Sequence, residues 1–355
     1  MPICHYKKFV STRSEDWEQL YQEKGVGPDQ SLTWVDALVN AHDIEQGNLR
    51  VLFGEEMGRI TWLLPCIYEK SAQFGFARNR LRSTGTIFGL HFEVLSRLDP
   101  KETAAQVLQS LHQLEPKWND IQFDKLVLGS ALVTGLSESA NAYDYYVDAT
   151  DGETPPYLEI SECWDDYLLT KTSNFRYNLK RKAKKLKQAG NIEIAYFEEG
   201  SGWPDVFDDI ENIERKSWKH DAGTSLRHFE QAFYPDLVSR CTEDIKPFVS
   251  ILKLDNVPIA YDLSIIAKNK GYCLKTSFRG DHSRLSPGNY LRSELLRQLF
   301  QKGLSEYDFL GDNESYKLQW ATDTRRHLNL RITKNVFSAL LRRKIRLLKT
   351  NLLDK

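Results

Sequence analysis

The 355-residue sequence has few of the features by which a protein class is recognised directly. Its five cysteines are scattered and include no CxxC pair, which excludes a zinc ribbon or a disulfide framework and favours reduced thiols. Its eight histidines are dispersed, and no HExxH, P-loop or GxSxG motif is present, so we expect no metal site. No apolar run approaches the ~20 residues of a membrane span, and the N-terminus has no signal-peptide pattern, so we expect a cytoplasmic protein.

The sequence also lacks an excess of charge of either sign. The 48 Lys and Arg residues are balanced by 49 Asp and Glu residues, which gives a net charge of −1. No global positive field therefore recruits DNA or an anionic membrane, and any such role needs a local patch. The hydrophobic fraction of 41% and the aromatic fraction of 12% exclude wholesale disorder. The length favours two domains or one large one.

The best linker in the chain is segment 148–156, which is rich in turn-forming residues. We therefore expect a domain over residues 1–150, a second domain over 151–335 and a closing basic helix over 336–355. The second domain reads as helices, an antiparallel three-stranded meander between 247 and 278, a crossover helix over 288–301, and strands over 306–310 and 327–333. This order predicts an α+β fold with a crossover helix over a mixed sheet. Both halves have a hairpin followed by a helix and a strand, which hints at a structural duplication.

The densest chemical signal is segment 279–291, where a strand ends, a polar loop follows and a helix begins near Gly288. The free N–H groups and positive dipole end of a helix start favour an anion, and a glycine there admits a phosphate to the backbone. Arg279 and Arg284 supply charge-assisted hydrogen bonds to such an anion. The alternative is an ordinary capped helix entry.

A second signal is segment 307–320, where a buried strand carrying Asp308 opens into an acidic loop that ends at Tyr316, Lys317 and Trp320. Loops at strand ends beside a crossover helix are common ligand sites in α/β sheets. The alternative is a strand followed by a solvated acidic loop.

A third signal is the basic segment 171–187, which holds eight Lys and Arg residues, with no acid between Asp166 and Glu193. Apolar residues at 175, 179, 183 and 186 mark one buried stripe at helical spacing, so the segment is predicted to be an amphipathic helix with a basic outer face. It favours an anionic ligand or surface, and the alternative is a solvated face. Segment 336–353 is also basic and amphipathic, and it is predicted either to lie on an anionic leaflet or to dock on the second domain.

Five segments in one order carry a family resemblance: NFRYNLKR at 174–181, ERKSWK at 214–219, PIA at 258–260, LSPG at 285–288, and YDF to YKLQW over 307–320. Together they resemble the FemAB-like branch of the GNAT acyltransferases, within it the CelD-like and polysaccharide-biosynthesis acetyltransferases. The resemblance covers about 160–325. It implies tandem GNAT-like lobes, of which the first is degenerate and the second is the complete acyl-CoA N-acyltransferase fold.

The resemblance implies acetyl-CoA or a related acyl-CoA as cosubstrate, with the pantetheine arm between two parted strands. Its pyrophosphate is expected on Ser286, Pro287, Gly288, Asn289 and Tyr290, with Arg279 and Arg284 nearby. The sequence departs from the usual Gln/Arg-x-x-Gly-x-Gly loop of the superfamily, because Gly288 is the only glycine at the helix start.

Acyl transfer needs a base for the proton of an attacking amine or hydroxyl and a stabilised oxyanion. The expected candidates for the base are Asp262, whose apolar sequence neighbours are expected to raise its pKa, Asp308 and Asp312. Tyr316 or Tyr272 is the expected acid for the departing thiolate. The expected acceptor is anionic, such as a sugar nucleotide or glycan of polysaccharide or cell-envelope biosynthesis. It is expected to contact Arg176, Arg181, Lys317 and Trp320.

Two other readings stay open. One is Fem-like transfer of an amino acid from aminoacyl-tRNA, with segment 171–187 on RNA phosphates. The other is a non-catalytic accessory protein of a polysaccharide-synthesis complex, peripheral to the inner face of the membrane. The acceptor itself is not encoded in a recognisable motif, because acceptor pockets in this fold come from variable loops.

Overall fold

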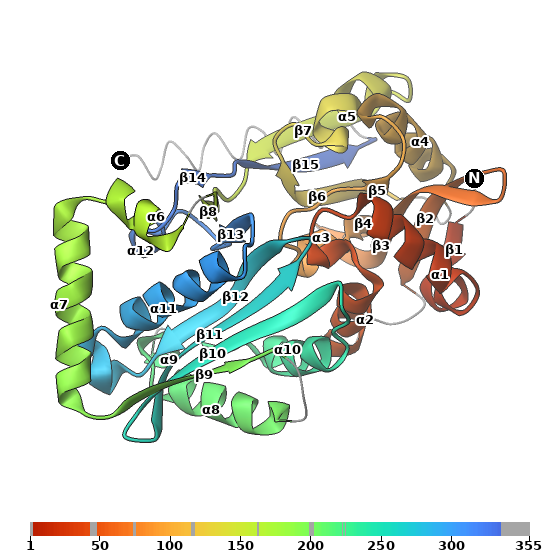
Figure 1. Ribbon diagram of the computed structural model, residues 1–355. Helices are drawn as coiled ribbons and strands as arrows, with labels where there is room; N and C mark the ends of the chain where they lie inside the picture. The colour runs from red at the N-terminus through yellow and green to blue at the C-terminus, as the bar shows by residue number, and fades with distance from the viewer. Residues whose placement is uncertain are drawn as a thin grey trace. The chain divides into compact units, whose positions relative to one another are not determined.

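The protein is described from a computed structural model, whose described residues are 3–42, 48–73, 76–114, 118–161, 163–198, 202–221, 223 and 225–334. These residues form two compact units, and each unit contains its own β-sheet (Figure 1). The basic amphipathic helix expected over 336–353 lies outside the described residues. Within them, no helix is both long enough and apolar enough to cross a bilayer.

The first unit combines a twisted sheet with five helices in its described part. Its helices are α1 (Tyr6–Lys24), α2 (Leu32–Ala41), α3 (Thr84–Phe88), α4 (Pro100–Gln113) and α5 (Ala131–Asn141). Its strands are β1 (Ile3–His5), β2 (Leu49–Glu56), β3 (Arg59–Gln73), β4 (Phe76–Ser83), β5 (Leu95–Ser96), β6 (Asp120–Val127), β7 (Tyr146–Asp151) and β15 (His327–Thr333).

The second unit contains the segments that carry the chemical signals. Its helices are α6 (Trp164–Thr170), α7 (Ser173–Ala189), α8 (Trp203–Arg215), α9 (Trp218–Asp221), α10 (His228–Ser239), α11 (Pro287–Gln301) and α12 (Ser315–Leu318), with a 3₁₀ turn η2 (Gly280–Leu285). Its strands are β8 (Pro156–Glu159), β9 (Ile192–Phe197), β10 (Ile245–Leu254), β11 (Val257–Ala267), β12 (Lys270–Phe278), β13 (Glu306–Asp308) and β14 (Asp323–Thr324). The predicted meander, crossover helix and basic helix are confirmed.

The two sheets repeat one topology. The first has the order β1-β2-β3-β4-β6-β15-β7, and the second has the order β9-β10-β11-β12-β13-β8-β14. In both, the fourth and fifth strands pair in parallel and the other neighbours pair antiparallel. A helix, α4 or α11, precedes the fifth strand in each unit. The duplication that the sequence only hinted at is therefore present at the level of topology.

The last strand of the chain belongs to the first sheet. β15 lies between β6 and β7 and pairs with both, so residues 325–334 belong to the first unit, and the expected boundary at 335 is corrected. The predicted linker 148–156 is corrected as well, because residues 148–151 are part of β7 and the units divide between Thr154 and Pro155. Sequence proximity misled the prediction, since β15 follows the second unit directly along the chain.

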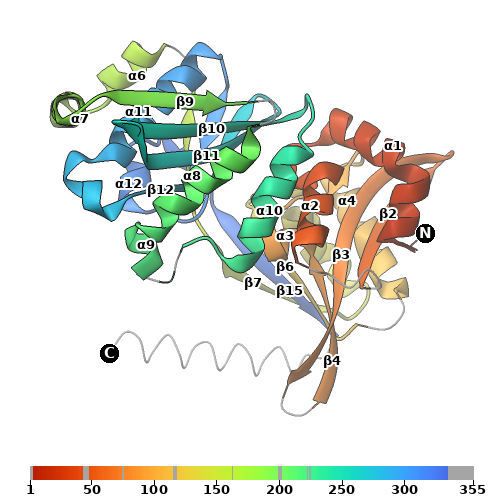
Figure 2. The same ribbon diagram turned by 90° about the horizontal axis from the view of Figure 1, so that it is seen from below.

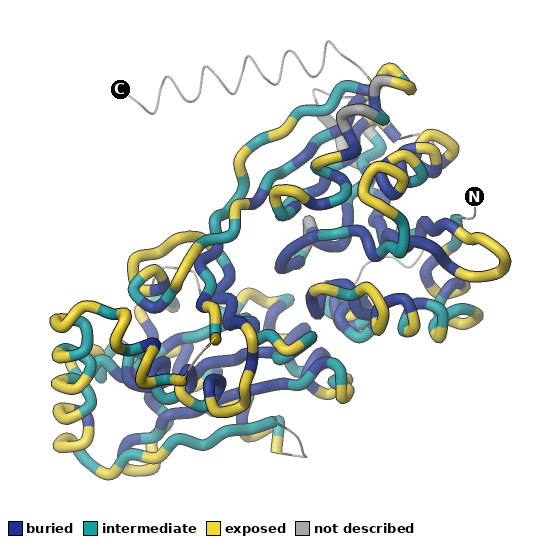
Figure 3. The backbone as a smooth tube through the Cα atoms, turned by 45° about the horizontal axis from the view of Figure 1, so that its top comes forward, coloured by how far each residue is buried: buried dark blue, intermediate teal, exposed yellow. Residues whose placement is uncertain are grey.

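Helices cover both faces of the second sheet. α11 packs on one face, with α6 and α7 beside it, and α8 packs on the opposite face (Figures 1 and 2). The central strands are deeply buried, whereas α7 alternates between intermediate and exposed residues, with Leu186 as its one buried side chain (Figure 3). α7 is therefore a surface helix that packs on the rest of the unit through one apolar stripe, as the periodicity of its sequence predicts.

The parallel strands β12 and β13 separate early. They pair only from Lys270 to Tyr272, opposite Glu306 to Asp308, after which β12 runs on to Phe278 with β11 as its partner. In the first unit the equivalent strands β4 and β6 also pair over three residues, but there Phe92 follows as a parallel bridge to Leu126. The chain itself therefore fills the gap in the first unit, whereas in the second unit a cavity lies beside the free half of β12.

Because Ile332 of β15 is fully buried in the core of the first unit, the mutation Ile332→Ala should destabilise the protein. We expect a loss of about 2–5 kcal/mol from the lost apolar contacts and the resulting cavity. Urea unfolding monitored by circular dichroism measures this change. A loss below about 0.5 kcal/mol, the usual range for surface changes, would contradict the placement of β15.

Candidate active site

A cavity of about 130 Å³ lies where β12 and β13 separate. Aromatic side chains form much of its wall, and its charged lining side chains are all cations. The lining residues are Trp218, Lys219, Thr276, Ser277, Phe278, Gly288, Asn289, Arg292, Phe309, Tyr316, Lys317 and Trp320. Three of the expected site segments, 214–219, 285–288 and 307–320, therefore contribute to a single cavity. No Asp or Glu lines it within the described part of the chain.

The start of α11 closes one side of this cavity. Ser286 precedes the helix in the left-handed conformation (φ 54°), and no side chain caps the first turn, which contains no acidic residue. A Cβ atom on Gly288 would lie 3.2 Å from Cδ1 of Phe278, so glycine keeps the helix start close to β12. An uncapped helix N-terminus beside a cavity is suited to an anion.

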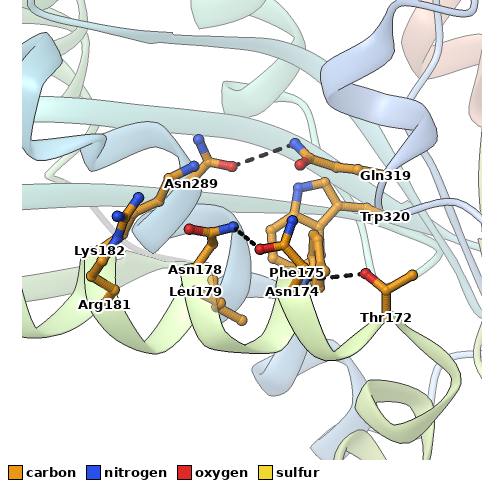
Figure 4. A pocket seen from close by; sticks show the side chains of 10 residues that line it. All are labelled: Thr172, Asn174, Phe175, Asn178, Leu179, Arg181, Lys182, Asn289, Gln319 and Trp320. Carbon is orange, nitrogen blue, oxygen red and sulfur yellow. Dashed lines mark hydrogen bonds between the residues drawn. The ribbon is translucent and has the colours of Figure 1, made fainter.

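A larger pocket of about 500 Å³ adjoins the same helix start (Figure 4). α7 forms one wall, and Asn289, Gln319 and Trp320 form the facing wall. Gln319 Nε2 donates a hydrogen bond to Asn289 Oδ1 at 3.4 Å. The α7 wall and the residue before it contribute Thr172, Asn174, Phe175, Asn178, Leu179, Arg181 and Lys182. Because Asn289 and Trp320 line both spaces, the large pocket and the small cavity are neighbours.

Asp262 lies in polar surroundings rather than the apolar ones expected. It is 1% exposed and forms an ion pair with Arg292 of α11 at 2.8 Å. Its Oδ1 accepts hydrogen bonds from Ser264 at 2.5 Å and from the Tyr307 hydroxyl at 3.1 Å. The expectation of apolar surroundings is therefore wrong, because the charged partner comes from a helix distant in sequence. Asp262 also does not line the cavity, and Arg292 does.

Asp308 ends β13 and is fully buried. Its Oδ1 accepts a hydrogen bond from the backbone N–H of Leu310 at 2.8 Å, where Leu310 takes a positive φ of 51°. This bond orders the loop after the strand. Neither Asp262 nor Asp308 reaches the lining of the cavity, so their catalytic role stays a prediction.

The predicted residues of α12 do reach the cavity. Tyr316 lines it, and burial raises the pKa of its hydroxyl, with Cys273 and Glu314 adding to the effect, so the hydroxyl stays protonated as an acid requires. Lys317 is 7% exposed and its Nζ lies 2.6 Å from both Glu314 Oε2 and the carbonyl oxygen of Leu310. Lys317 is therefore a buried residue of the cavity wall rather than an exposed contact for an acceptor.

Other predicted residues lie outside both spaces. Arg176 donates to the carbonyl oxygens of Leu168, Leu169 and Lys171, so it stabilises the end of α6. Arg279 pairs with Asp281 at 2.6 Å. Arg284 and Tyr290 are absent from the lining of either space, and Tyr290 packs in the core beneath α7 and α11. Arg181, Trp320 and Asn289 are brought together in the larger pocket.

Lys219 and Ser277 are two of the cavity residues for which the sequence predicted no role. Nζ of Lys219 lies 2.5 Å from the carbonyl oxygen of Thr276, and burial lowers its pKa. The hydroxyl of Ser277 is 4% exposed and has no hydrogen-bond partner in the described structure. Lys219 occurs in the ERKSWK segment that contributes to the family resemblance, but this segment by itself indicates no chemical role for the lysine. Ser277 lies in an ordinary strand pattern that contains no such signal.

Comparison with known sequences agrees with this geometry. Residues 173–318, from the start of α7 to the end of α12, match the acetyltransferase (GNAT) domain family. The matched segment contains every residue that lines the small cavity except Trp320. No curated protein sequence matches the chain significantly.

Solved structures resemble nearly the whole chain at low sequence identity. FemX has a TM-score of 0.61 at 10% identity, covering 93% of this chain and 97% of its own. The C-terminal domain of a putative lysylphosphatidylglycerol synthetase from Agrobacterium fabrum has a TM-score of 0.60 at 14% identity, covering 92% and 93%. The synthetase L-PGS from Bacillus licheniformis has a TM-score of 0.55 at 11% identity, covering 92% of each chain.

The second unit is thus a GNAT acyltransferase domain, and the protein is an acyltransferase. Over its whole length, the chain has a fold like that of FemX and of the two synthetases. The family match itself lies within the second unit.

The mutation Gly288→Val should block the approach of a phosphate to the start of α11, because the added side chain meets Phe278. We expect acetyl-CoA binding to weaken by about 2 kcal/mol or more, roughly 30-fold in Kd. Isothermal titration calorimetry measures the change. Gly202→Val is the matched control, since a Cβ there meets nothing within 4 Å. If the folded Gly288→Val variant binds acetyl-CoA as tightly as the wild type does, the start of α11 is not part of the donor site.

Proposed function

We propose that the protein transfers an acyl group from an acyl-CoA, with acetyl-CoA as the reference donor, to an amine or hydroxyl acceptor. The observation that carries the proposal is the cavity beside the free half of β12, next to the uncapped start of α11. The unpartnered, buried Ser277 hydroxyl in that cavity fits a ligand with polar groups along its length. In the proposal, the thioester and pantetheine end occupies this cavity.

The adjoining pocket suits the remainder of the same donor. CoA is far larger than a space of about 130 Å³, and the 500 Å³ pocket adjoins it through Asn289 and Trp320. Arg181 and Lys182 supply positive charge there, opposite the start of α11. We therefore assign Arg181 to the phosphates of the donor, whereas the sequence favoured an anionic acceptor.

The charge of the small cavity favours an acyl group over an aminoacyl group. Lys219, Arg292 and Lys317 line it, and the described lining includes no carboxylate. An α-ammonium group buried there would find no carboxylate partner in this lining, and burying an unpaired charge costs free energy. Transfer of an amino acid from aminoacyl-tRNA is the competing function, and its support is the fold that this chain shares with FemX.

The acceptor is proposed to be an anionic sugar nucleotide or glycan of polysaccharide or cell-envelope biosynthesis. The family resemblance of the sequence is its support. In the reaction, the acceptor nitrogen or oxygen attacks the thioester carbon and loses a proton, and the thiolate leaves. Tyr316 lines the cavity and carries a proton, so it is the proposed donor to the thiolate, and its raised pKa makes it a weaker acid than an exposed tyrosine.

The first unit is proposed to have no donor site of its own. Its α4 is capped by Asp99, whose Oδ1 accepts hydrogen bonds from the N–H groups of Lys101 and Glu102. Two carboxylates, those of Asp99 and Glu102, therefore occupy the helix start where an anion would bind. The gap between β4 and β6 is bridged by Phe92, which stacks on Phe123.

Titration with acetyl-CoA should therefore give one site per chain. Isothermal titration calorimetry measures the stoichiometry directly. When the titration is repeated with deacylated tRNA mixed with the protein, the affinity for acetyl-CoA should be unchanged. A stoichiometry of two would contradict the closed gap of the first unit. Competition by tRNA, together with no acetyl-CoA binding when tRNA is absent, would favour the aminoacyl reading instead.

Reversing the charges of the larger pocket should weaken the donor. For the double variant Arg181→Glu and Lys182→Glu, we expect the Kd of acetyl-CoA to rise about tenfold at low salt, or ~1.4 kcal/mol. The effect should shrink at 1 M salt, where the Debye length falls to about 3 Å. Lys184→Glu, on the exposed side of α7, is the control. An unchanged Kd for acetyl-CoA would contradict this assignment and would favour the larger pocket as the acceptor site.

A further inference from the structure

The acid–base chemistry of the small cavity is restricted by its lining. Its ionisable side chains, among the described residues, are Lys219, Arg292, Tyr316 and Lys317. Acyl transfer needs a group that takes the proton of the attacking acceptor, and in GNAT-like chemistry that group must be close to the thioester. Because the lining contributes no carboxylate, the choice falls among these four.

Three of the four are unsuited to accept a proton. The Arg292 guanidinium stays charged in proteins and is bound to Asp262 at 2.8 Å. The Lys317 nitrogen is already engaged in an ion pair with the Glu314 carboxylate. Burial raises the pKa of Tyr316, so its hydroxyl keeps its proton.

Lys219 differs from these in geometry and environment. Its Nζ donates to the Thr276 carbonyl, which lies on the free half of β12 directly before Ser277. This contact places the nitrogen of Lys219 in the cavity wall beside the edge of β12, within the space proposed for the thioester.

Groups on three other elements act on the charge of Lys219. Burial disfavours the charge and lowers the pKa of the amine, and Lys275 of β12 and Lys317 of α12 lower it further. Glu214 of α8 and Cys273 of β12 act in the opposite direction. Glu214 is itself engaged by hydrogen bonds from Tyr261 and Ser225, each at 2.6 Å.

We propose that Lys219 is the proton acceptor of the transfer, a catalytic residue that the sequence motifs did not identify. Nζ takes the proton from the attacking nitrogen or oxygen as the bond to the acyl carbon forms. The carbon–sulfur bond then breaks, and the proton passes from Lys219, or from Tyr316, to the thiolate, so that CoA leaves as the thiol. If Tyr316 supplies that proton, Lys219 returns its own to the tyrosinate. This inference rests on the proposed acyl-CoA function.

The test uses the full chain with water as acceptor, because the biological acceptor is unidentified. Acetyl-CoA hydrolysis is followed by release of the CoA thiol, and acetyl-CoA binding is measured by calorimetry. The wild-type rate should rise with pH through the pKa of Lys219, since the neutral amine is required. Both Lys219→Ala and Lys219→Arg should lose about 100-fold in kcat, the lower end of general-base catalysis, with Kd changed less than threefold. Lys184→Ala should behave as wild type.

The arginine variant separates a base from a cation that stabilises the oxyanion. An oxyanion role would leave Lys219→Arg active and make the rate fall as pH rises, and either result would overturn the proposal. Lys219→Ala with wild-type hydrolysis and the same pH profile would also overturn it. Absence of acetyl-CoA binding in the wild type would instead overturn the proposed function itself.

A labelling experiment tests the role of Lys219 without measuring catalysis. Amine acetylation by a water-soluble reagent, read by mass spectrometry at several pH values, should modify Lys219 at lower pH than Lys184. Desulfo-CoA, which has no acyl group to transfer, should protect Lys219 and leave Lys184 reactive. Lys219 that titrates together with Lys184, or that stays reactive with the ligand bound, would contradict the inference.

Discussion

One buried ion pair fixes the point at which the second sheet opens. The Arg292 guanidinium of α11 pairs with Asp262 of β11. It also donates a hydrogen bond to the hydroxyl of Tyr307 in β13 at 3.0 Å and lies 3.4 Å from Sγ of Cys273 in β12. A single side chain therefore contacts all three strands around the separation. Removing one partner of a buried pair leaves an uncompensated charge, which typically costs about 3–5 kcal/mol, so these strands and α11 can hardly rearrange independently.

The rest of the site is arranged around that fixed point. Arg292 reaches the cavity with one face of its guanidinium over Phe309, at 5.3 Å, so the floor of the cavity is both positive and aromatic. Above it, the start of α11 contributes Gly288 and Asn289. Lys219 comes from α9 and contacts the Thr276 carbonyl of β12. The cavity is thus built around the Arg292–Asp262 pair and from short elements beside it.

Local sequence pattern predicted the elements of the second unit well, because each is determined by its own periodicity and turns. Apolar residues at 175, 179, 183 and 186 predicted α7, and the two-residue turns at 255–256 and 268–269 predicted the meander. The partners of buried polar groups were not predictable in this way. Nothing near Asp262 in the sequence indicates that Arg292, thirty positions later, neutralises it. The sheet to which β15 belongs was hidden for the same reason, since its partners β6 and β7 lie almost two hundred residues earlier.

The two units show how one topology supports a ligand site in one copy and a closed core in the other. Both have a parallel strand pair that ends after three residue pairs and a helix that begins beside it. In the first unit, Phe92 bridges the widening strands and Asp99 satisfies the helix start, so both backbone features acquire internal partners. In the second unit no side chain caps the helix start, and Ser277, on the free half of β12, is buried without a hydrogen-bond partner. An unsatisfied buried hydroxyl costs about 1–3 kcal/mol, a cost that a hydrogen bond to the proposed donor would relieve. The difference between the units therefore lies in a few side chains and one loop, and it follows physically from which polar groups the chain satisfies by itself.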